Sequence, residues 1–158
     1  MGQLRIRPAV PGEAAALSAL AVRSKAHWGY DEAFLDACRD ELATAAEECD
    51  GIHVQVAERD GALIGYYKLA GQPPVGELAD LFIDPSAIGA GVGSRLLRHA
   101  LDLARRLGLH ILTIDADPNA EAFYRRAGAV RVGSVASGSI PGRELPRLEL
   151  RLGDLLCT

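Results

Sequence analysis

The stretch Asp84–Leu97, which reads DPSAIGAGVGSRLL, decides the fold class of this chain. Its three glycines alternate with small apolar residues, and the run that follows predicts a helix to about Arg106, ended by Gly108. The largely apolar segment Glu77–Ile83 just before it predicts a strand that is central in a sheet and buried. A glycine-rich turn between a strand and a helix lets backbone N–H groups approach an anion such as a phosphate.

Periodicity and turn residues predict the elements on either side of this stretch. Before it we expect a strand, two helices and a hairpin: Leu4–Pro8, Glu13 to about Lys25, a helix capped by Asp31 that runs to about Glu48, and a hairpin from Val54 through Asp60-Gly61 to Leu69, followed by the loop QPPVG at 72–76. After it we expect a strand, a short helix and two strands: Ile111–Asp115, a helix capped by Asn119 and ended at Gly128, AVRVGSV at 129–135 and LPRLELRL at 145–152. The order βααβββαβαββ predicts one α/β domain with a mixed sheet over residues 1–158.

Composition and charge limit the class of function. Of the 158 residues, 49% are hydrophobic and 24% charged, which is typical of a globular protein with its own core. The net charge of −4 disfavours nucleic acid as a partner, and no apolar run reaches the roughly 18 residues of a membrane span. The N-terminus also lacks the apolar core of a signal peptide, so we expect a cytoplasmic protein without nucleic-acid or membrane partners.

The cysteines and histidines do not predict a metal site. Cys38, Cys49 and Cys157 form no CxxC pair, and the four histidines are scattered without the spacing of metal ligands. Cys38 falls on the apolar side of a predicted helix and is expected to be a core residue.

Two nucleotide-binding motifs are alternative interpretations of the glycine stretch. Gly89 and Gly91 fit the first two positions of the dinucleotide fingerprint G-x-G-x-x-G, but Ser94 replaces the third glycine and Asp84–Ile88 separate the turn from the strand. A P-loop requires Gly-Lys followed by Ser or Thr, whereas this chain has Gly93-Ser94-Arg95. Neither motif is complete.

A third interpretation combines the glycine stretch with a second motif. The segment Ile88–Gly93 fits the pattern Arg/Gln-x-x-Gly-x-Gly/Ala at both glycines, with Ile88 where the pattern has Arg or Gln. Further along, five residues fit an Asn…Ala-Phe-Tyr…Gly pattern in spacing and identity: Asn119, Ala122, Phe123, Tyr124 and Gly128. Together these motifs resemble those of the GNAT superfamily of acyl-CoA-dependent N-acetyltransferases, whose order of strands and helices the chain also fits.

This resemblance implies the architecture and the cosubstrate. It implies a mostly antiparallel sheet of about seven strands flanked by about four helices, with acetyl-CoA bound where the fourth and fifth strands separate. From the scattered cysteines and histidines we expect no metal cofactor. The residues expected to contact acetyl-CoA lie on the fourth strand, the glycine loop and the Asn119 motif: Leu81, Phe82, Ile83, Ile88, Gly89, Ala90, Gly91, Val92, Gly93, Ser94, Asn119 and Tyr124. Arg95 or Arg98 is expected to supply part of the positive charge that Ile88 lacks.

The resemblance also implies catalytic residues. Tyr124 matches the tyrosine that many members use as the general acid for the leaving thiolate, and we expect Phe123 rather than Tyr124 to fill the core. Glu77, at the start of the fourth strand, is the candidate base, and Asp80 is its rival. Some members need no dedicated base.

On the acceptor side, the resemblance implies that the junction of the first two helices lines the pocket. Trp28 and Tyr30 in this junction, together with Asp80, are the candidate acceptor-binding residues. We expect transfer of the acetyl group to a primary amine of a small molecule or peptide by direct attack in a ternary complex. A CoA-binding sensor or regulatory module without catalysis is the alternative. Homodimers are common in the family.

Overall fold

The structure is a computed structural model that describes residues 2–153, so Cys157 lies outside the described residues. The strands and helices follow the predicted order: β1 (Arg5–Pro8), α1 (Ala14–Ala26), α2 (Glu32–Leu42), β2 (Val54–Arg59), β3 (Ala62–Gln72), β4 (Val75–Ile83), α3 (Val92–Arg106), β5 (Ile111–Asp115), α4 (Glu121–Arg126), β6 (Val130–Ala136) and β7 (Glu144–Arg151). Short 3-10 turns include η1 (Pro11–Glu13), η2 (Ala46–Glu48), η3 (Pro85–Ala87) and η4 (Pro118–Ala120).

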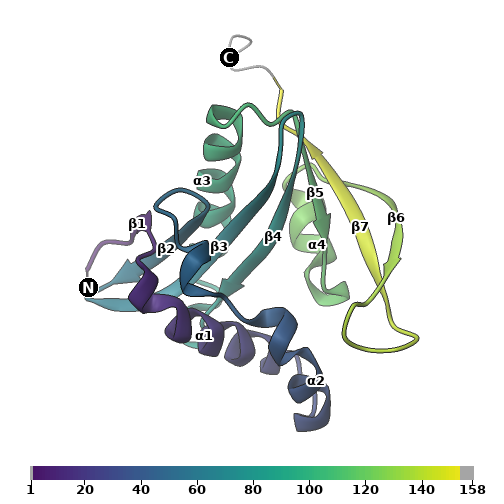
Figure 1. The fold of residues 1–158 in the computed structure, drawn as a ribbon, viewed down its shortest axis with the longest axis horizontal. Coiled ribbons are helices and arrows are strands. Elements are labelled where there is room, and N and C mark those ends of the chain that lie inside the picture. The colour runs from purple at the N-terminus through teal and green to yellow at the C-terminus, as the bar shows by residue number, and fades with distance from the viewer. Residues whose placement is uncertain (1, 154–158) are drawn as a thin grey trace. The chain divides into compact units, whose positions relative to one another are not determined.

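The strands form a seven-stranded sheet in the order β1-β2-β3-β4-β5-β7-β6 (Figure 1). β1 with β2, β2 with β3, β5 with β7 and β6 with β7 are antiparallel, whereas β4 and β5 are parallel. The predicted mixed α/β fold is therefore confirmed.

The chain divides into two compact units. Among the described residues, the first unit contains residues 2–68 together with Asp80–His99, and the second contains Leu69–Ala79 and residues 100–153. The single domain expected over residues 1–158 stays a prediction.

The first unit has a core of apolar side chains from α1, the hairpin and α3. The side chains with the least exposure include Leu17, Leu20, Val54, Val56, Tyr66, Tyr67 and Leu96. At Gly65 of β3, a Cβ atom would come within 2.9 Å of Leu96 Cδ1 and 3.0 Å of the Phe82 carbonyl oxygen. Gly65 therefore allows α3 to pack closely against β3.

The second unit has a core formed by alternate residues of two paired strands. Leu112 of β5 is opposite Leu150 of β7, Ile114 is opposite Leu148, and all four are buried. Their alternation with more exposed residues is the pattern of strands buried on one face.

Turn residues act as the sequence predicts at three places. Asp60 and Gly61 have φ angles of 53° and 79°, as a two-residue hairpin turn requires. The Asp31 carboxylate caps α2 by accepting a hydrogen bond of 2.9 Å from the Phe34 N–H. Gly108, with φ 85°, follows the last turn of α3.

The second helix is shorter than predicted. α2 ends at Leu42, and the Thr44 N–H donates to Ser18 Oγ of α1 at 2.8 Å. This tertiary hydrogen bond draws the chain into an extended conformation at Ala43, and only the short turn η2 follows before Cys49. The loop expected at 72–76 is also shorter, because β3 runs to Gln72 and β4 begins at Val75.

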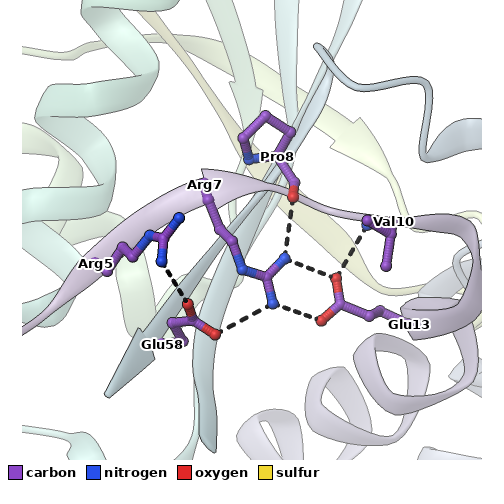
Figure 2. A network of polar contacts seen from close by, with 6 residues as sticks. All are labelled: Arg5, Arg7, Pro8, Val10, Glu13 and Glu58. Atoms are coloured by element: carbon purple, nitrogen blue, oxygen red, sulfur yellow. Dashed lines mark hydrogen bonds and ion pairs between the residues drawn. The ribbon is translucent and has the colours of Figure 1, made fainter. Parts of the chain in front are cut away.

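The first strand is joined to its neighbours by charged groups around Arg7 (Figure 2). The Arg7 guanidinium donates to both carboxylate oxygens of Glu13, at 3.0 and 2.8 Å, to Glu58 at 3.2 Å and to the Pro8 carbonyl at 3.1 Å. Glu13 also accepts from the Val10 N–H at 3.0 Å. The hydrogen bonds from Arg7 hold the pKa of Glu13 below its ordinary value, so this carboxylate stabilises the fold in its ionised form.

We predict that Arg7→Met lowers the free energy of unfolding by about 2 kcal/mol, because two partly buried carboxylates lose their hydrogen-bond donor. Urea unfolding at neutral pH measures this loss. Since the pKa of Glu13 is lowered in the folded state, its contribution is present above the ordinary carboxylate pKa and disappears as the pH falls through the lowered value. The difference between variant and wild type should therefore shrink in acid.

Arg5→Met is the matched control. The Arg5 side chain is 73% exposed and lies 3.9 Å from Glu58, so its loss should change the unfolding free energy by no more than about 0.5 kcal/mol. Equal effects of the two substitutions would contradict a special role for Arg7.

Candidate functional site

The loop between β4 and α3 is held by the carboxylate of Asp84. It accepts hydrogen bonds from the Ser86 N–H at 3.0 Å, from the Ser86 hydroxyl at 2.8 Å and from Arg23 of α1 at 2.8 Å. Burial raises the pKa of Asp84, but the hydrogen bonds from Arg23 and Ser86 outweigh it and hold the pKa below its ordinary value. The Asp84 carboxylate thus holds the start of the glycine loop through its hydrogen bonds to Ser86 and to Arg23 of α1.

The glycines that follow leave the backbone open. Gly89 and Gly91 have φ angles of 88° and 80°, a left-handed conformation that favours glycine, and no atom lies within 4 Å of a Cβ built at either. Within residues 2–153, five backbone N–H groups in and after the loop have no hydrogen-bond partner: those of Gly89, Gly91, Val92, Gly93 and Ser94. Several unpaired donors at the positive end of a 15-residue helix are suited to an anion.

The side chains around this loop supply positive charge. Ile88 is 45% exposed and brings none. Arg95 and Arg98, in the first two turns of α3, are both exposed, and neither forms an ion pair within the part of the chain that the structure describes. Their guanidinium groups are therefore available to a negatively charged ligand.

The strand β4 is central in the sheet but not buried throughout, so that part of the prediction is wrong. Its first half alternates between exposed and buried residues, and Leu81, Phe82 and Ile83 are each half-buried. Its parallel register with β5 covers Val75–Glu77, and β4 continues for six residues beyond it.

Asp80 belongs to a polar cluster in the first unit. Its Oδ2 atom accepts a hydrogen bond of 3.2 Å from the Tyr66 hydroxyl and lies 3.3 Å from Lys68 Nζ, which also lies 3.0 Å from Glu48 Oε2. The Asp80 side chain is 10% exposed. Its burial raises the pKa of Asp80 even though Lys68 and Tyr66 oppose the change. A carboxylate with a raised pKa is suited to accept a proton near neutral pH.

Glu77 has a different environment. It lies in the part of β4 that pairs with β5, opposite Thr113. It is exposed, and within residues 2–153 its carboxylate has neither a hydrogen bond nor an ion pair.

Tyr124 lies on α4, in the second unit. Contrary to expectation, Tyr124 is buried, with 6% exposure, whereas Phe123 is only half-buried. The predicted cap at Asn119 is also wrong, because Pro118 starts the turn η4 one residue earlier. Asp117 caps it instead, accepting from the Asn119 N–H at 2.9 Å and from the Asn119 side-chain amide at 3.0 Å. Arg143 Nη2 lies 3.4 Å from the other Asp117 oxygen, so an ion pair supports the turn that leads to α4.

The junction of α1 and α2 presents aromatic side chains. Trp28 is 46% exposed and forms an edge contact with His27, with ring centroids 5.6 Å apart. The Tyr30 ring stacks on Phe34 at 4.0 Å, and Lys25 Nζ lies 5.7 Å from the centre of the Tyr30 ring. This surface offers flat apolar rings beside polar groups.

The sequence interpretation missed Lys68, Glu48 and Tyr66 as partners of Asp80. A lysine inside the apolar run GYYKLAG at 65–71 was the available signal, because a buried ammonium group requires a carboxylate partner.

The described residues contain neither a cluster of metal ligands nor a membrane-spanning helix. No three His, Cys, Asp or Glu side chains among them come close enough together to hold a metal ion. None of their helices combines the length and the apolar character that crossing a bilayer requires.

Comparison with known proteins identifies the family. The model of the acetyltransferase (GNAT) family matches residues 5–129, which is most of the chain. This chain therefore belongs to the GNAT acetyltransferase family, and the resemblance noted in its motifs is confirmed.

Individual relatives agree in sequence and fold. The N-alpha-acetyltransferase RimI of Mycobacterium tuberculosis is 40% identical over 86 residues, which are 51% of this chain and 54% of that protein. The chain spans 39% to 60% of the length of the curated relatives it matches. The structure described as "GCN5-Related N-acetyltransferase: Aminotransferase, Class-II" from Rhodopseudomonas palustris superposes with a TM-score of 0.78 at 28% identity, covering 96% of this chain and 97% of that one.

A more distant structure has the same fold. The PaiA N-acetyltransferase of Thermoplasma acidophilum, solved in complex with coenzyme A, superposes with a TM-score of 0.75 at 18% identity, covering 94% of this chain and 99% of that one.

Proposed function

We propose that this protein is an N-acetyltransferase that transfers the acetyl group of acetyl-CoA to a primary amine by direct attack in a ternary complex. The observation that carries the proposal is the set of five unpaired N–H groups around Gly89 and Gly91 at the start of α3. Membership of the GNAT family and the coenzyme A complex of PaiA support it.

The glycine loop fits the pyrophosphate of acetyl-CoA in chemistry. Its free donors and open space suit a group with several anionic oxygens. Arg95 and Arg98 would compensate for Ile88, which has no charge to offer. Leu81, Phe82 and Ile83 of β4, each half-buried, are proposed as further contacts of acetyl-CoA. Asn119 is proposed as another.

Acetyl-CoA supplies a thioester carbonyl, and the protein has to manage two protons. The acceptor arrives as an ammonium ion and must lose a proton before its nitrogen can attack. Asp80 is the base that we favour: Oδ2 is held by Tyr66 and Lys68, and Oδ1 has no partner within residues 2–153. Exposed Glu77 is the alternative. Tyr124 is proposed as the acid, because a phenol keeps its proton at neutral pH and can donate it to the departing sulfur. The C–N bond forms as the C–S bond breaks, and the second proton that the nitrogen loses on becoming an amide replaces the one that the phenol gave to the thiolate.

The acceptor is proposed to be a primary amine of a small molecule or a peptide. RimI is named as an N-alpha-acetyltransferase, which supports peptide amines as one class to test. Trp28 and Tyr30 offer rings against which an acceptor can pack, and Asp80 offers the negative charge that attracts an ammonium group. A cytoplasmic location and a homodimer stay predictions.

Thiol release from acetyl-CoA across a panel of polyamines, aminoglycosides, amino acids and short peptides tests the function, with thermal shift in acetyl-CoA and in NAD alongside. Turnover with one class of amine would establish the enzyme and narrow the acceptor. Stabilisation by acetyl-CoA without turnover would favour the alternative, a CoA-binding sensor or regulatory module. Stabilisation by NAD alone would overturn the assignment of the loop.

We predict that Gly91→Glu weakens acetyl-CoA binding by at least about tenfold, or ~1.4 kcal/mol, because a carboxylate would enter the space reserved for phosphate. Isothermal titration calorimetry measures this affinity. Gly61→Glu is the matched control, because the φ angle of Gly61 is 79° and that of Gly91 is 80°. A Cβ built at either glycine meets no atom within 4 Å. Both variants carry the strain of a left-handed glutamate, and only Gly91→Glu should lose affinity. If the two variants bind acetyl-CoA equally well, the phosphate does not bind at Gly91.

We predict that Asp80→Asn lowers kcat by about tenfold or more, whereas Glu77→Gln changes it by less than about twofold. The amide keeps the shape of each carboxylate but removes its basicity. Steady-state kinetics at saturating acetyl-CoA measures both. The reverse order of effects would make Glu77 the base, and full activity in both variants would show that this enzyme needs no dedicated base.

We predict that Tyr124→Phe lowers kcat by about tenfold or more while the dissociation constant of acetyl-CoA stays within about twofold, because the phenyl ring retains the packing and loses only the proton donor. An unchanged kcat, in conditions where product formation shows no burst, would remove Tyr124 from the role of acid.

A further inference from the structure

Lys68 is a buried charged residue that the proposed reaction has not yet explained. It lies on β3 between Tyr67 and Leu69, both almost completely buried, and its own side chain is 11% exposed. An ammonium group in such a position is costly unless carboxylates surround it. Glu48 Oε2 at 3.0 Å and Asp80 Oδ2 at 3.3 Å provide them.

The contacts of Asp80 are divided unequally between its two oxygens. Lys68 and the Tyr66 hydroxyl both contact Oδ2, while Oδ1 has no partner among the described residues. Two contacts on one oxygen fix the carboxylate in one orientation and leave the other oxygen able to accept a proton. The cluster also has two carboxylates for one ammonium group, so it carries an excess negative charge that suits a cationic acceptor.

We propose that Lys68 is a positioning residue for the acetyl transfer. It holds Oδ2 and keeps the Asp80 carboxylate ionised, so that Oδ1 receives the proton of the acceptor ammonium. The negative charge of Glu48 has the opposite effect on the ionisation of Asp80. This inference rests on the proposed function with Asp80 as its base. In the step itself, one N–H bond of the ammonium breaks, one O–H bond forms at Oδ1, and the nitrogen keeps the electron pair with which it attacks.

Each charged or polar neighbour of Asp80 either raises or lowers the pKa of its carboxylate. Lys68 and Tyr66, from β3, favour the ionised carboxylate and lower its pKa. Burial and the negative charge of Glu48, from η2, favour the protonated form and raise its pKa. Removing Lys68 should therefore raise the pKa of Asp80, and removing the charge of Glu48 should lower it.

The test measures the titration of Asp80 in the full chain. The protein is labelled with ¹³C at the aspartate carboxyls, and the signal lost in Asp80→Asn identifies Asp80. Lys68→Met should move its titration midpoint up by at least about one pH unit, and Glu48→Gln should move it down. Lys68→Arg keeps the charge and should leave the midpoint near that of the wild type.

The same variants are then assayed for kcat/KM against pH, with the amine of the panel that gives the fastest thiol release. The acidic limb of each profile should move with the midpoint of Asp80, up for Lys68→Met and down for Glu48→Gln. Glu48 is 42% exposed, so Glu48→Gln tests the inference even if Lys68→Met does not fold. Retained acetyl-CoA affinity, measured by calorimetry, shows that a variant is folded.

If the acidic limb moves up in Lys68→Met and down in Glu48→Gln, the positioning role is supported. A purely structural lysine would change the rate without moving the pH profile. An unmoved midpoint, or a midpoint that moves while the limb does not, would overturn the role of Lys68 and leave the acetyltransferase itself standing. Full activity in Asp80→Asn, or no turnover of any amine, would instead overturn the proposed base or the proposed function.

Discussion

Gly89 and Gly91 hold left-handed backbone between the end of β4 and the start of α3, and the proposed use of the fold depends on this constraint. A residue with a Cβ at either position would strain this left-handed backbone, which glycine adopts without strain. The turn leaves the first N–H groups of α3 without partners. Asp84, bonded to Ser86 and Arg23, holds the other end of the same loop. Several unpaired N–H donors at a helix N-terminus are suited to an anion.

Two networks of charged groups in the first unit are built differently. Around Arg7, a planar guanidinium donates to two carboxylates and a carbonyl at once, which suits a fixed structural joint. Around Lys68, a compact ammonium contacts one oxygen of each of two carboxylates, and Asp80 keeps its second oxygen unpartnered within residues 2–153. The first network stabilises strand and turn, whereas the second has a carboxylate with a raised pKa and an oxygen left for chemistry.

Much of the fold could be predicted because its signals are local. The Asp60-Gly61 turn, the Asp31 cap and the end of α3 at Gly108 each depend on the conformational preference of one or two residues. The end of α2 could not be predicted, since Leu42 is the last helical residue for a reason that lies in α1, where Ser18 accepts from the Thr44 N–H. Asn119 failed as a cap because its neighbour Pro118 already starts the turn.

The candidate site also has a part that local sequence motifs predict and a part that depends on tertiary contacts. The sequence alone determined the glycine loop, the Asn119–Gly128 motif and the resemblance to the family, because each is a run of residues whose spacing is itself the signal. Only the tertiary structure joined Asp80 to Lys68 and Glu48. Those residues lie far apart along the chain, and their contacts depend on strand pairing and on where η2 comes to lie. A periodic pattern encodes which face of a strand is apolar, but not which charges meet once that face is buried.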